Sequence, residues 1–163
     1  MHLNPAHPGK GASDPEDLGV IVLDAPILGI TPAVLPSLGL LDNNGSLRNS
    51  LFAIVGYGAT DTLFGGGAPD ANEGEGTRRY AREGFLALNP NLIKLNQNTA
   101  FGYGASSHGD SGGPNFLKPP NPGPSLLVAI TIGGDSWGIE QNVAYRLDTP
   151  QARAFLCQFV PRP

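Results

Sequence analysis

Residues 109–114 read Gly-Asp-Ser-Gly-Gly-Pro, and this stretch decides how the rest of the chain is interpreted. Glycines on both sides of Ser111 let the backbone turn sharply and leave room for a substrate carbonyl group. In such a turn the backbone N–H groups of Gly109 and Ser111 can point at the spot where a tetrahedral intermediate places its negative oxygen. The stretch therefore predicts an exposed, nucleophilic serine, and the alternative is a glycine-rich turn without chemistry.

The stretch resembles the nucleophile motif of the chymotrypsin/trypsin-like serine proteases, and two earlier stretches extend the resemblance. Residues 17–23 followed by 30–36 look like the family's catalytic-aspartate strand and the linker that leaves its first barrel. Residues 52–58, Phe-Ala-Ile-Val-Gly-Tyr-Gly, look like the first strand of its second barrel, which usually carries Gly-Trp-Gly at that point. The resemblance covers the chain from about residue 17 to residue 160.

The resemblance implies an all-β fold of the trypsin-like double-barrel type, with the second barrel complete and the first largely missing. Residues 1–40 would be the remnant of the first barrel, and residues 41–163 would form the second barrel and a short C-terminal helix. Composition agrees with an all-β chain, because 15% of the residues are charged and there are 23 glycines and 16 prolines.

The hydrophobicity pattern places the individual elements. Apolar runs and alternating segments predict strands at residues 18–23, 51–57, 78–88, 91–96, 126–132 and 142–147. We read residues 1–16 and 101–116 as loops, and residues 118–124 as an extended connector. Thr149 and Pro150 predict the start of the helix, whose apolar stripe is Ala152, Phe155, Leu156 and Phe159.

Carried over residue by residue, the resemblance assigns roles at a catalytic site. Ser111 is the nucleophile, the amides of Gly109 and Ser111 form the oxyanion hole, and Asp17 orients a catalytic histidine. Asp14 and Asp24 are alternatives for the aspartate, and we prefer Asp17 because it directly precedes an apolar strand. The order of aspartate before serine agrees with the family.

The family's catalytic histidine has no counterpart in this chain. It belongs to an Ala-Ala-His-Cys-like stretch well before the aspartate, whereas the histidines here are His2, His7 and His108. We expect all three to be exposed loop residues. Loss of the histidine from a comparable triad lowers kcat by a factor on the order of 10⁶. The expected function is therefore a serine endopeptidase acting on peptides or proteins, without a cofactor or metal, and nearly inactive as this chain.

The resemblance also makes predictions around the serine. Asp110, which the family pairs with a new α-amino group, is expected to point outward here, because leaving it buried and unpaired costs about 3–5 kcal/mol. Ser107 and Gly138 stand where the family has a disulfide, and Cys157 is expected to be a small packed residue. A substrate pocket without a negative floor is implied at Ala105, Ser106, His108, Gly133 and Gly134.

The sequence argues against several other functional classes. A net charge of −4 argues against nucleic acid binding, and no apolar run is long enough to cross a membrane. The prolines after Ser111 and the lack of a later histidine argue against an α/β-hydrolase nucleophile elbow. Two interpretations stay open: a non-catalytic binding module, and part of a longer secreted protease whose signal is not in this chain, which we prefer. A partner that supplies the missing half-barrel is unknown.

Overall fold

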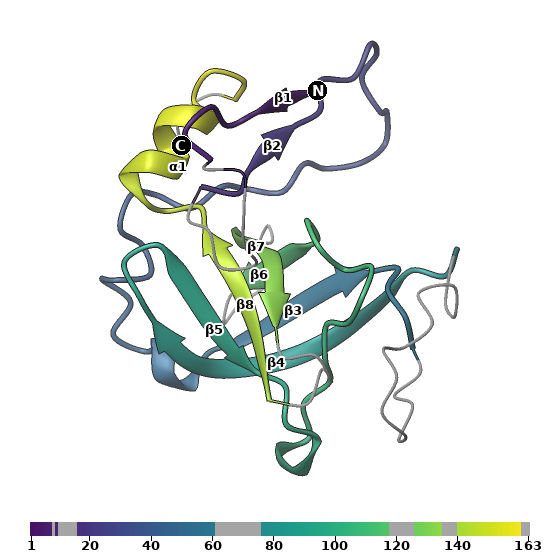
Figure 1. The fold of residues 1–163 in the computed structure, drawn as a ribbon, viewed down its shortest axis with the longest axis vertical. Helices are drawn as coiled ribbons and strands as arrows, with labels where there is room; N and C mark the ends of the chain where they lie inside the picture. The colour runs from purple at the N-terminus through teal and green to yellow at the C-terminus, as the bar shows by residue number, and fades with distance from the viewer. Residues whose placement is uncertain (8, 10–15, 61–75, 118–125, 135–139, 161–163) are drawn as a thin grey trace.

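The centre of the molecule is a closed antiparallel β-barrel of six strands (Figure 1). The computed structural model describes residues 1–7, 9, 16–60, 76–117, 126–134 and 140–160. The barrel strands, in their order around it, are β3 (Leu51–Gly56), β4 (Arg79–Leu88), β5 (Leu92–Asn96), β8 (Gln141–Arg146), β7 (Leu126–Gly134) and β6 (Pro114–Leu117). The prediction of a mostly β chain with a short C-terminal helix is confirmed.

Five of the six barrel strands lie where the hydrophobicity pattern predicts strands, and their inward apolar side chains form the core. Phe52 and Ile54 on β3 and Ile93 and Leu95 on β5 turn inward and are buried in one core. The sixth strand, β6, falls partly in the segment read as a loop, and it pairs with both β3 and β7 to close the barrel. Its four residues are too short a run to stand out beside the glycine-rich turn.

The N-terminal segment forms a separate two-stranded sheet of β1 (His2–Leu3) and β2 (Gly19–Val20). The predicted strand at 18–23 is therefore wrong beyond Val20. Ile21, Val22 and Leu23 are 71%, 58% and 55% exposed and belong to a long loop that leaves this sheet (Figure 1). The physical reason is that the strand's partner, β1, offers two residues, and such a small ribbon is marginally stable.

The C-terminal helix α1 (Pro150–Leu156) is confirmed with its predicted cap. The Thr149 side-chain oxygen accepts a hydrogen bond from the Ala152 N–H at 3.2 Å, and Pro150 opens the helix. The buried side of α1 packs in a second core with Leu18 from the N-terminal segment. This core attaches the N-terminal segment to the barrel.

Two short 3₁₀ helices, η1 (Leu47–Asn49) and η2 (Thr99–Phe101), complete the described elements. No helix in the described ranges is long and apolar enough to cross a membrane. Cys157 is a free, partly buried cysteine after α1. The predictions for Asp14, Gly138 and the connector at 118–124 lie outside the residues that the structure describes.

Candidate active site

The turn that carries Ser111 needs glycine at two positions. Gly109 and Gly112 have φ angles of 94° and 79°, in the left-handed region that favours glycine. The turn is fastened to β7, because the Gly112 N–H donates to the Thr131 carbonyl at 2.8 Å and the Thr131 N–H donates to the Gly113 carbonyl at 3.0 Å. Ser111 therefore sits on an exposed turn that the barrel holds on one side.

Two backbone amides of this turn have no hydrogen-bond partner among the described residues. The N–H groups of Gly109 and Ser111 donate to nothing in the part of the chain that the structure describes, and both residues are exposed. The Ser111 hydroxyl likewise makes no hydrogen bond with a described residue. The turn thus presents a hydroxyl and two free donors to solvent, a set of groups that can accept an acyl carbon and its oxygen.

The prediction that Asp110 points outward is wrong. Its Oδ1 accepts a hydrogen bond from the Gly58 N–H at 2.8 Å, and its Oδ2 accepts one from the Ser107 N–H at 2.9 Å. A Cβ on Gly58 would lie 2.6 Å from the Asp110 Cγ, and one on Gly56 would overlap Oδ1, so both glycines make room for the carboxylate. Two amide donors replace the cationic partner that the family resemblance implies, and they allow the carboxylate to turn inward.

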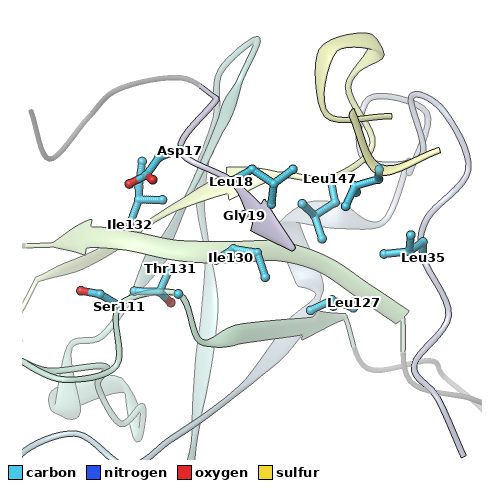
Figure 2. A pocket seen from close by; sticks show the side chains of 12 residues that line it. Asp17, Leu18, Gly19, Leu35, Ser111, Leu127, Ile130, Thr131, Ile132 and Leu147 are labelled. Atoms are coloured by element: carbon cyan, nitrogen blue, oxygen red, sulfur yellow. The ribbon is translucent and has the colours of Figure 1, made fainter. Parts of the chain in front are cut away.

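Asp17 and Ser111 line one pocket of about 430 Å³. Figure 2 shows them at the same end of it, with Ile132 beside Asp17, while Leu35 and Leu127 lie at the opposite end. The Asp17 side chain is 52% exposed, and the alternative Asp24 lies on the exposed loop after β2. The structure therefore brings together the predicted nucleophile and the preferred aspartate, which are far apart in the sequence.

The five residues predicted to form a substrate pocket lie elsewhere. None of them lines the pocket shared by Asp17 and Ser111. Ser106 is buried, and its hydroxyl accepts a hydrogen bond from the Gln97 Nε2 at 2.7 Å, so that this side chain faces the barrel interior. The other four are exposed or partly exposed: Ala105, His108, Gly133 and Gly134. Their role in substrate binding stays a prediction.

His7 differs from the exposed loop residue that we expected. Its side chain is 29% exposed, and its Nε2 lies 4.0 Å from the Asp17 Oδ1. Its Nδ1 is buried without a hydrogen-bond partner in the described parts of the chain. His2 on β1 packs against Phe159, with ring centroids 4.8 Å apart, and His108 is exposed as expected. The His7–Asp17 contact joins irregular segments, so no periodic pattern in the sequence signals it.

Glu83, which the sequence reasoning missed, lies inside the barrel with no exposed surface. Its Oε1 accepts hydrogen bonds from the Gln97 Nε2 and the Ser106 N–H, both at 3.1 Å, and its Oε2 accepts one from the Asn142 Nδ2 at 3.0 Å. Burial raises the pKa of Glu83 from 4.5 to about 7, and these hydrogen bonds offset part of that rise. A titratable group therefore stands behind the loop that leads to Ser111.

Comparison with known proteins gives no further assignment. No family model matches the chain, and no curated protein matches it. Among the described residues no group of three His, Cys, Asp or Glu side chains is arranged to hold a metal ion.

Proposed function

We propose that the chain carries the nucleophile side of a serine endopeptidase site of the trypsin-like type. The observation that carries this proposal is the Ser111 turn, which exposes a hydroxyl beside two unpartnered amides while Asp110 anchors it from within. The closed antiparallel barrel and the C-terminal helix are consistent with the second barrel of that fold. The segment before residue 40 then corresponds to what remains of a first barrel.

The chemistry that this site supports is acyl transfer. The Ser111 Oγ would attack the carbonyl carbon of a peptide bond, and the N–H groups of Gly109 and Ser111 would hold the resulting oxyanion. The bond between the carbonyl carbon and the leaving nitrogen then breaks, and water later releases the acyl group. Throughout, the hydroxyl proton has to move to an acceptor and from there to the leaving amine.

The proton acceptor is the weak part of the site. A serine hydroxyl is a poor nucleophile without a neighbouring base, and no described residue accepts a hydrogen bond from the Ser111 hydroxyl. The His7 Nε2 lies 4.0 Å from the Asp17 Oδ1, but His7 makes no hydrogen bond to Ser111. We therefore propose that this chain hydrolyses peptides very slowly by itself, and that a complete, secreted form supplies the missing base.

A second function is favoured by the same observation. Because nothing described takes the proton of Ser111, the barrel can serve as a non-catalytic module that binds a peptide in the same place. The two functions differ in a measurable way, since only a catalytic site responds to an added base.

Imidazole added in solution supplies such a base and is small enough for a pocket of about 430 Å³. We expect a fluorophosphonate probe to label Ser111 slowly in buffer and faster as imidazole is added. The Ser111→Ala variant should stay unlabelled, and Asp17→Asn should show a weaker imidazole response. Labelling that is absent at every imidazole concentration, in a folded protein, would contradict the catalytic proposal and favour the binding module.

A further inference from the structure

A chain of side-chain hydrogen bonds crosses the barrel from Glu83 to the strand that holds the Ser111 turn. The Asn142 Nδ2 donates to the Glu83 Oε2 at 3.0 Å and to the Asn115 Oδ1 at 2.9 Å. The Asn115 Nδ2 then donates to the Thr131 Oγ1 at 2.9 Å. All four side chains are buried. They come from four different strands, β4, β8, β6 and β7, so the hydrogen-bond network spans the interior of the barrel.

Both ends of this hydrogen-bond network contact the loop that carries Ser111. At one end, Glu83 accepts a hydrogen bond from the Ser106 N–H, five residues before Ser111. At the other end, the Thr131 carbonyl accepts the Gly112 N–H, directly after Ser111. A change in the hydrogen bonds of Glu83 therefore acts on the backbone both before and after Ser111.

The direction of the hydrogen bonds depends on the charge of Glu83. A carboxylate only accepts, so Asn142 has to present its Nδ2 to Glu83, and Asn115 has to present its Oδ1 to Asn142. This arrangement leaves the Asn142 Oδ1 buried without a partner among the described residues. A protonated carboxyl group, by contrast, needs an acceptor, and a half-turn of the Asn142 amide presents that orphaned oxygen. The Gln97 Oε1 is likewise without a described partner, but a half-turn of Gln97 would also break its Nε2 hydrogen bonds to Ser106.

We propose that Glu83 is a positioning residue for the Ser111 turn, and that its protonation from solvent reverses the direction of the hydrogen bonds as far as Thr131. In the reversed state the Glu83 hydroxyl donates to the Asn142 Oδ1, and the Asn115 Nδ2 donates to that same oxygen. The Thr131 hydroxyl then donates to the Asn115 Oδ1. Each state has three hydrogen bonds between these side chains, and the reversed state gives up only the longer bond, 3.4 Å, from the Asn115 Nδ2 to the Gly113 carbonyl. The two states can therefore exchange without unfolding the barrel.

Asp110, whose carboxylate anchors the Ser111 turn, is the charge that adds to the rise in the pKa of Glu83. The strands β3, β6 and β7 carry no ionisable side chain. The remaining strands carry Arg79, Tyr80 and Arg82 on β4, Lys94 on β5, and Tyr145 and Arg146 on β8, and Tyr103 lies in the loop after η2. Arg82 is exposed, and Arg146 is bound to Asp42 and Asp148.

The network is tested by nuclear magnetic resonance on the isotope-labelled full chain between pH 5 and pH 9. We expect the Glu83 carboxyl carbon, the side-chain amides of Asn142 and Asn115, and the Gly112 backbone amide to titrate with one midpoint near pH 7. In Glu83→Gln the three amide signals should stop titrating near pH 7. The matched control Asp24→Asn, at an exposed carboxylate, should titrate like the parent protein.

The outcome that overturns the proposal is a Glu83 titration that the Asn142, Asn115 and Gly112 signals do not follow, or amide signals that titrate unchanged in Glu83→Gln. The consequence for Ser111 reactivity rests on the proposed function. It is measured separately, as the pH profile of fluorophosphonate labelling per mole of unprotonated imidazole. We expect an inflection near pH 7 that Glu83→Gln lacks. Amides that titrate together in a protein never labelled at Ser111 would uphold the network and refute the proposed function.

Discussion

Replacing Glu83 by glutamine should change how the stability of the protein depends on pH. The side chain is fully buried and its pKa rises from 4.5 to about 7, with burial as the main cause. The folded protein therefore holds a proton at Glu83 that the unfolded chain releases between these two values. Glutamine fills the same volume without a charge, so the variant removes the titration and leaves the shape of the interior intact.

The sign and size of the effect follow from the linkage between proton binding and folding. Because the pKa is higher in the folded state, the contribution of Glu83 is fully present below pH 4.5 and is lost as the pH rises to about 7. At 1.36 kcal/mol per pKa unit, the loss amounts to about 3 kcal/mol of the free energy of unfolding. Carboxylates elsewhere can produce slopes of the opposite sign, so the informative quantity is the difference between the parent protein and the variant.

Urea unfolding at pH 4.5 and pH 8, followed by circular dichroism, measures that difference. We expect the parent protein to lose about 3 kcal/mol more than Glu83→Gln between the two pH values, while the exposed control Asp24→Asn follows the parent protein. Parallel pH profiles for the parent protein and Glu83→Gln would show that Glu83 titrates alike in both states, and would refute the reasoning.

Two further substitutions test the anchors of the fold and of the site. Gly58→Ala places a Cβ 2.6 Å from the Asp110 Cγ, and displacing that carboxylate from its amide partners should cost about 3 kcal/mol in urea unfolding and abolish labelling of the nucleophile. Gly45→Ala, where a Cβ meets nothing within 4 Å, is the control and should unfold like the parent protein. Arg146→Met should lower the free energy of unfolding in urea by about 3–5 kcal/mol, because it leaves the buried Asp148 without its cationic partner. A loss below about 1 kcal/mol would contradict this.

The barrel could largely be predicted from the sequence, because β3 and β5 bury every second residue and β7 is a continuous apolar run. The alternation in β3 and β5, and the Thr149 cap of α1, place elements without knowledge of their partners. The prediction of a strand after β2 was wrong for the opposite reason. An apolar run forms a buried strand only where a partner covers it, and Ile21 to Leu23 are exposed.

The candidate site was predictable only where a local motif determines it. The glycines around Ser111 indicate a sharp turn, and a left-handed φ is found at Gly109 and Gly112. The inward Asp110 depends on space left by glycines some fifty residues earlier, which no local pattern reveals. Glu83 follows Arg82 in the strand, so alternation alone does not tell which of the two charged residues faces inward.

The most direct test of the central claim is a crystal structure of the chain after its reaction with a fluorophosphonate in the presence of imidazole. The account predicts a phosphonyl group on the Ser111 Oγ, with one phosphonyl oxygen accepting hydrogen bonds from the N–H groups of Gly109 and Ser111 at about 2.7–3.1 Å. Asp110 should remain bound to the Gly58 and Ser107 amides. An adduct whose phosphonyl oxygen points to solvent, with both amides still unpartnered, would contradict the account.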